Sequence, residues 1–141
     1  MLKKVAGLFL AVAVSVSSGW ILRGQESNAS IAEVYYWKAK PGKLEDYNQY
    51  IKTVGEPVDF EARRVGAFVS ITTYISRNPD SPWTHMRVFA LKDREQAANL
   101  KRALDEAGLR VQPDEAKRKA NADLAATLRD AAGHEELEIL K

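Results

Sequence analysis

Two side chains that are costly to bury, His85 and Arg87, lie in a segment that otherwise has the composition of a buried strand, WTHMRVFAL at residues 83–91. Successive side chains of a strand point to opposite faces, so the imidazole and the guanidinium share one face. Because the unperturbed pKa of histidine is close to neutral pH, His85 is a candidate catalytic acid or base. Spacing alone identifies no second titrating group that would work with it.

Two further predicted strands, residues 31–40 and 67–75, supply side chains that could join this pair. Alternation gives each strand two faces, and on the second and third strands one of the two is mainly aliphatic. We expect the aliphatic faces to pack under the helices and the other faces to join into one surface. That surface would hold Glu33 and the candidate ligand-binding residues Tyr35, Trp37, Ser70, Thr72, Tyr74, His85, Arg87 and Phe89.

Helical periodicity predicts the elements that connect these strands. Apolar residues spaced by threes and fours follow Lys43, and Gly55 and Pro57 predict a break into helices at 43–54 and 57–65, the second ended by Gly66.

The third strand is followed by two more predicted helices. Asp93 and Gln96 have the spacing of a capping box and begin a helix that we expect Gly108 to end. Pro113 then begins a further helix that Gly133 would end. The segment EELEILK at residues 135–141 is predicted to form a short last strand.

The resulting order is βαββαβ with one extra helix, which predicts an α+β fold of the ferredoxin-like type with an antiparallel sheet. Two segments carry a resemblance to a known superfamily. VYYWKAKPGKLEDYNQYI at 34–51 resembles the opening strand, Pro-Gly-Lys turn and helix of dimeric α/β-barrel proteins. GEPVDFEARRVGAFVSITTY at 55–74 resembles the matching helix and second strand of their secreted members.

This superfamily includes antibiotic-biosynthesis-type monooxygenases, EthD-like and NIPSNAP-like proteins, and haem enzymes related to chlorite dismutase. The resemblance implies a homodimer in which a second subunit covers the open sheet face and the two sheets enclose a cavity. Its members differ widely in function, so the fold implies no particular reaction.

The amino-terminal residues have the layout of a secretory signal. MLKK is followed by the apolar run VAGLFLAVAVSV and then by small residues, with Val16 and Ser18 at plausible positions for cleavage. We therefore predict a signal peptide at 1–18, a linker at 19–30, a single domain at 31–141 and a location outside the cytoplasm. The alternative is an uncleaved membrane anchor, because no charge occurs from Val5 to Leu22.

Composition excludes several classes of function. The chain has 141 residues, a formal net charge of +2 and no cysteine, so it has no disulfide and no thiol nucleophile. Without Lys3 and Lys4 the remaining 19 basic residues equal the 19 acidic ones, which argues against a nucleic-acid partner.

Several functional interpretations stay open. The predicted surface serves either a small-molecule binder or cofactor-independent enzyme, or an envelope protein in which it only joins two subunits, with Arg87 paired to Glu33. No cofactor or metal is assigned. A haem on His85 or His134 is an alternative by family analogy, and His134 with Glu136 could share a face as metal ligands.

Overall fold

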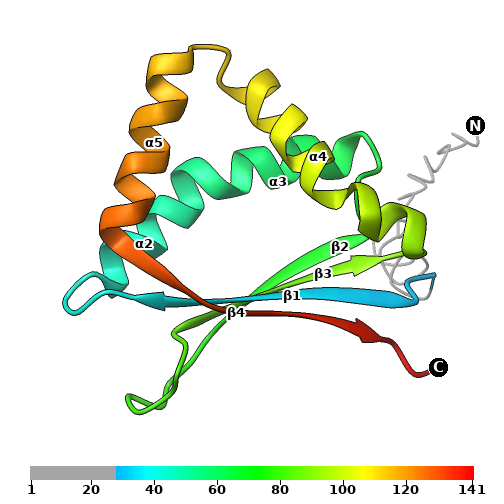
Figure 1. The fold of residues 1–141 in the computed structure, drawn as a ribbon, viewed down its shortest axis with the longest axis horizontal. Helices are drawn as coiled ribbons and strands as arrows, with labels where there is room; N and C mark the ends of the chain where they lie inside the picture. Colours follow the sequence, from blue (N-terminus) through cyan, green and yellow to red (C-terminus); the bar gives the residue numbers. More distant parts are fainter. Residues whose placement is uncertain (1–27) are drawn as a thin grey trace, which may run out of the picture.

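The computed structural model describes residues 28–141, which form one sheet with helices on one side of it (Figure 1). The predicted signal peptide and most of the predicted linker lie outside the described residues. The last linker residues are part of the fold, contrary to the prediction. Ala29 is 3% exposed, and the amide of Ser30 donates to the carbonyl of Leu91 at 2.8 Å.

The sheet is antiparallel and contains the strands β1 (Ile31–Ala39), β2 (Ser70–Ile75), β3 (His85–Leu91) and β4 (Arg129–Glu138). Their spatial order is β2-β3-β1-β4, so the first and third strands are central and the last strand lies at an edge. Together with the helices between the strands, this order confirms the predicted α+β, ferredoxin-like fold.

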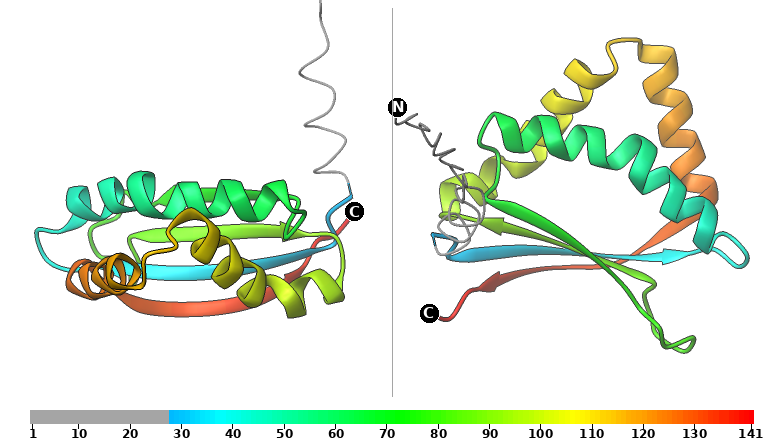
Figure 2. Two further views of the ribbon diagram at one scale, coloured as in Figure 1. Left: turned by 90° about the horizontal axis from the view of Figure 1, so that it is seen from above. Right: turned by 180° about the vertical axis from the view of Figure 1, so that it is seen from behind.

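The helices form two rows above the sheet. The first row contains α2 (Leu44–Tyr50), the π-helical turn η1 (Ile51–Gly55) and α3 (Glu56–Arg64), and the second contains α4 (Arg94–Val111) and the extra helix α5 (Glu115–Leu128). Seen from above, β1 is visible between the two rows (Figure 2). No helix among residues 28–141 is both long and apolar enough to cross a bilayer.

The predicted break at Gly55 and Pro57 is wrong, because the helix continues through both residues. Proline has no amide hydrogen and cannot donate to the carbonyl four residues before it. The helical turn contains one extra residue instead. The amide of Glu56 donates to the carbonyl of Ile51, five residues before it, which is the π-helical pattern.

Three other predicted boundaries are also corrected. Helix α4 passes through Gly108 to Val111, and α5 begins after Asp114, whose side chain accepts from the amide of Lys117 at 3.1 Å. Helix α5 ends at Leu128 rather than at Gly133, because residues 129–138 pair with β1. The last strand is therefore longer than predicted and begins earlier in the chain.

Candidate functional site

The strand register divides the predicted surface between the two faces of the sheet. His85, Arg87 and Phe89 pair with Trp37, Tyr35 and Glu33 of β1, so these six residues do share a face. That face packs under the helices, because Phe89 belongs to the main core with Ala62 of α3 and Leu100 of α4. The prediction that this face is open is wrong.

The hydroxylic residues of β2 lie on the opposite face. Ser70, Thr72 and Tyr74 pair with Ala90, Val88 and Met86, whose side chains point away from the helices. The aliphatic positions of β1 and β3 therefore form the open face together with them. Alternation shows which residues of one strand share a face, but it does not show how faces of different strands combine.

His85 lies at the centre of a buried hydrogen-bond network. Its side chain is fully buried; Nε2 lies 2.8 Å from Oδ1 of Asn48, and Nδ1 lies 2.9 Å from Oγ1 of Thr84. The ring also contacts the ring of Tyr47, with centroids 4.4 Å apart.

These contacts position the imidazole. The amide oxygen of Asn48 can only accept, so Nε2 of His85 carries a proton. Nδ1 lies beside the hydroxyl of Thr84, which also donates to the carbonyl of Trp37 at 3.2 Å. Burial, with help from the guanidinium groups of Arg129 and Arg87, lowers the pKa of His85 from 6.5 to about 4. Both ring nitrogens thus have partners in the protein, which favours a structural role for this side chain.

Arg87 forms its ion pair with Asp59 of α3. The alternative predicted from the sequence, a pair between Arg87 and Glu33, is therefore wrong. Both side chains of this pair are largely buried, and burial raises the pKa of Asp59 against the opposing effect of Arg87. The guanidinium Nε atom of Arg87 is buried and has no hydrogen-bond partner in the described residues. Glu33 is hydrogen-bonded to His134 of β4 instead.

Arg129, at the start of β4, brings a second guanidinium to this cluster. Its Nη1 atom donates to the hydroxyl of Tyr47 at 2.9 Å, and its Cζ atom lies 3.4 Å from the centre of the Trp37 ring. A guanidinium stacked on an indole in this way is held by a cation–π interaction. The cluster thus combines two arginines, one carboxylate and a neutral imidazole under the helices.

Sequence reasoning missed four members of the cluster: Tyr47, Asn48, Asp59 and Arg129. One of them left a signal, because Asp59 lies eight residues after Ile51 and three before Ala62, on the buried stripe of its helix. A charged residue at such a position predicts a buried partner. Arg129 left none, because its strand was predicted as helix.

The cavities on the described surface include five with volumes from about 290 to about 600 Å³, and neither His85 nor Arg87 lines any of these five. The 600 Å³ cavity is a groove between the two rows of helices, and we call it the helix groove. Its wall is mainly apolar and includes Val54, Pro57, Val58, Leu104, Leu109 and Val111, and its polar members include Tyr50, Asp105, Arg118 and Asn121.

Gly108 of α4 also lines the helix groove, and nothing in its surroundings requires a glycine. A Cβ atom added there would meet no atom within 4 Å, and its φ is not positive. Glycine in a helix interior costs roughly 1 kcal/mol relative to alanine. The missing side chain leaves the groove open at this point.

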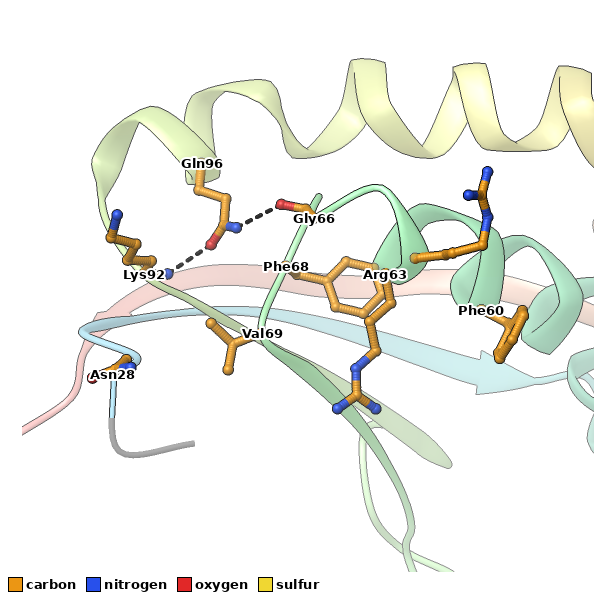
Figure 3. A pocket seen from close by; sticks show the side chains of 9 residues that line it. Asn28, Phe60, Arg63, Gly66, Phe68, Val69, Lys92 and Gln96 are labelled. Atoms are coloured by element: carbon orange, nitrogen blue, oxygen red, sulfur yellow. Dashed lines mark hydrogen bonds between the residues drawn. The ribbon is translucent and has the colours of Figure 1, made fainter. Parts of the chain in front are cut away.

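A second cavity of about 560 Å³ lies at the other end of α3 (Figure 3). Phe60, which is 74% exposed, and the buried Phe68 form its aromatic part. Gln96 closes one side, since its amide donates to the carbonyl of Gly66 and accepts from the amide of Lys92. Both polar atoms of the Gln96 side chain are thus hydrogen-bonded within the protein.

The residues do not fit the haem alternative at His85. The imidazole is fully buried and its Nε2 atom is bonded to Asn48, so no ring nitrogen is available to an iron atom. His134 is bonded to Glu33 through Nε2. Residues 28–141 contain no group of three or more histidine, aspartate or glutamate side chains placed to hold a metal ion.

Comparisons with known proteins support the fold. No family model matches the chain, and no curated protein matches its sequence. HapK from Hahella chejuensis has a similar structure with a TM-score of 0.50 and 10% sequence identity, over 78% of this chain and 92% of HapK. A dimeric protein of unknown function and ferredoxin-like fold from Bacteroides fragilis NCTC 9343 has a TM-score of 0.48 and 9% identity, over 77% and 95% of the two chains.

At these identities a likeness concerns the fold alone. The likeness to HapK supports the fold and singles out none of the families that the sequence resembles. The chain is an α+β protein of the ferredoxin-like fold.

Proposed function

We propose that this chain is an exported small-molecule-binding protein that acts as a homodimer and holds its ligand in the helix groove. The volume of about 600 Å³ lies within the 300–1,000 Å³ that is usual for small-molecule sites. A mainly apolar wall with a few polar groups is also the usual composition of such sites. Export is supported by the signal-like sequence at residues 1–18.

Gly108 is the observation that carries this proposal. Neither backbone conformation nor packing within the described residues explains a glycine in the interior of an 18-residue helix. A side chain at this position would extend into the groove and reduce its volume. Keeping the groove open is a physical reason for accepting the cost in helix stability.

The homodimer is supported by the open face of the sheet. No helix among the described residues covers this face (Figure 1). Its side chains are mainly apolar, and Tyr74 and Leu137 are about half exposed, whereas Ala32 and Val34 are buried within the subunit. A contiguous apolar face of this kind needs a cover. The occupant we propose is a second copy of the chain, as the resemblance to dimeric α/β-barrel proteins implies.

A second candidate is a non-catalytic envelope protein in which the sheet only joins two subunits. The satisfied network around His85 favours it, because that network explains the residue without a ligand. The same network is why we propose binding rather than a reaction at His85. Acting as a base would require the buried imidazole to give up its contact with Thr84 or Asn48.

Substitutions at Gly108 distinguish the two candidates. Gly108→Leu should fill the groove, and Gly108→Ala is the matched control because it gives a similar gain in helix propensity with a much smaller side chain. We expect the uncharged dye Nile red to bind the wild type and the alanine variant, and its affinity for the leucine variant to fall at least tenfold.

Equal dye affinity for all three proteins, or none for the wild type, would favour the envelope protein without a ligand. Native mass spectrometry of protein purified from its own host provides an independent test, because a bound ligand of the groove should be retained and should be absent from the leucine variant.

A further inference from the structure

We infer that Arg118 determines the specificity of the helix groove and that, together with Asn121, it selects a ligand with a carboxylate group. This inference rests on the proposed function and names the chemical class of the ligand of the same site. Both residues line the groove itself, so a ligand that fills the groove contacts them. The predicted ligand is an apolar molecule with one carboxylate at the end that meets α5.

The polar and the apolar parts of the groove come from different helices. Helices α4 and α5 diverge from their connection toward the sheet (Figure 1). Val54 and Val58 of the first row and Leu104 of α4 supply apolar wall, whereas Arg118 and Asn121 belong to α5. Residues three apart on a helix share a face, so α5 borders the groove with both polar residues on one face.

Two hydrogen bonds hold the guanidinium of Arg118 in place. Its Nη1 atom donates to the carbonyls of Gln112 and Pro113 at 2.9 and 2.6 Å. Both acceptors belong to the connection between α4 and α5, and Gln112 itself lines the groove. A side chain that is already held loses less conformational entropy when a ligand binds to it. The guanidinium is thus positioned in the wall of the groove before a ligand binds.

The other edge of this guanidinium can still donate hydrogen bonds. Its Nε and Nη2 atoms have no hydrogen-bond partner within residues 28–141. Arg64 shows what this edge can bind, because it uses the same two atoms to hold the carboxylate of Glu61, at 2.8 and 2.9 Å. Two parallel bonds of this kind fit a carboxylate and do not fit an alcohol. The free edge of Arg118 therefore predicts a carboxylate as its partner.

The positive charge of Arg118 also lacks a counter-ion. Its acceptors among the described residues are two uncharged carbonyls, and the residue is partly buried. The carboxylate that lines the groove, Asp105, is paired with Lys101 at 2.7 Å. A partly buried cation without a counter-ion is costly, so an anionic ligand is favoured.

Asn121 supplies further donors on the same face of α5. The residue is partly buried, and its side-chain amide has no hydrogen-bond partner in the part of the chain that the structure describes. The amide nitrogen of asparagine has two N–H donors, and the two oxygens of a carboxylate accept several hydrogen bonds. One carboxylate can therefore accept from Arg118 and Asn121 together.

Isothermal titration calorimetry with decanoate and decanol at neutral pH tests this selectivity, because the two probes have similar apolar chains and only decanoate is charged. We expect the wild type to bind decanoate about tenfold or more tightly than decanol. Arg118→Met should remove this preference and leave the affinity for decanol nearly unchanged. Arg118→Lys, which keeps the charge but lacks the parallel donors, should show a reduced preference.

Lys119→Met is the matched control. Lys119 follows Arg118 on α5 but is not among the residues that line the groove, and it pairs with Asp123 at 2.6 Å. The change removes the same charge from the same helical turn. The preference for decanoate should survive it, because the parallel donors of Arg118 remain.

Three results would overturn the role of Arg118. They are equal affinities of the wild type for the two probes, a loss of preference in Lys119→Met as large as in Arg118→Met, and an equal fall of both affinities in Arg118→Met. The last result would make Arg118 a structural residue of the connection. In each case Nile red binding by the wild type would leave the groove proposal standing. If neither probe nor Nile red binds the wild type, the proposed function itself is wrong.

Discussion

Ionisable and aliphatic side chains are distributed between the two faces of the sheet in the reverse of the usual way. The face under the helices carries the ionisable side chains Glu33, His85 and Arg87, whereas the open face carries aliphatic residues such as Met86 and Val88. A helix layer usually covers the more apolar face of a sheet. Here the polar residues are the covered ones.

The helices make this possible because they supply polar partners. Asn48 of α2 bonds His85, and Asp59 of α3 pairs with Arg87. A buried polar group is costly only while it lacks a partner. The comparison therefore teaches that polarity alone does not reveal which face of a strand is buried.

The largest effect should come from breaking the ion pair on the covered face. Asp59→Leu leaves Arg87 largely buried without its carboxylate, and we expect it to lower the free energy of unfolding by about 3–5 kcal/mol. The double variant Asp59→Leu with Arg87→Met should recover most of this loss, because it removes both charges. Chemical denaturation measures both values.

Asp123→Leu is the control for this prediction, since Asp123 forms an exposed pair with Lys119 on α5. Exposed pairs contribute about 0–1 kcal/mol, so its effect should be small. A loss from Asp59→Leu no larger than that from Asp123→Leu would show that the pair under the helices does not stabilise the fold.

The next effect concerns the pH dependence of stability. The unfolded imidazole of His85 takes up a proton near pH 6.5, whereas the folded one does so only near pH 4. Unfolding therefore binds a proton in this range, so this contribution to stability is complete above pH 6.5 and is lost as the pH falls toward 4, by at most about 1.4 kcal/mol per pH unit. Thermal melts at several pH values measure it.

His85→Leu should remove this slope and also cost about 1–3 kcal/mol at pH 7, because Asn48 loses its hydrogen-bond donor. Met86→Leu, one residue further on the open face, is the control and should keep the slope of the wild type. A His85→Leu protein that is as stable as the wild type at pH 7 would contradict a structural role for the imidazole.

The smallest effect on folding should come from the open face. Val88→Lys places a charge among the apolar residues of that face, and we expect it to cost about 1 kcal/mol or less in the free energy of unfolding of one subunit. Its effect on association should be large, because a buried lysine opposes the proposed dimer. Light scattering should show a dimer for the wild type and a monomer for the variant.

Val65→Lys provides the comparison, since Val65 is half exposed and lies at the end of α3, away from the sheet. It should remain dimeric. A wild-type chain that is monomeric at micromolar concentration would overturn the dimer proposal, while a Val88→Lys protein that stays dimeric would place the interface elsewhere.

Much of the fold was predictable because it depends on local chemistry. Alternation in β1 and β3, the helical spacing after Lys43 and the Asp93–Gln96 cap are properties of short segments, and they suffice for the ferredoxin-like order. The cap itself is confirmed, with the amide of Gln96 bonded to Asp93 at 2.9 Å. The Gln96 side chain differs slightly from the prediction, because it bonds the amide of Lys92.

The sequence by itself therefore determined the order of the elements and the location of His85 and Arg87 on the same face of the sheet. The tertiary structure alone decided which face the helices cover, because that depends on partners that are distant along the chain. Asn48 lies 37 residues from His85, and Asp59 lies 28 residues from Arg87. It also decided that residues 129–133 are strand, since pairing with β1 outweighs a helical pattern that continues through them. Local preference amounts to less than about 1 kcal/mol for an ordinary residue, and long-range pairing and burial readily exceed it.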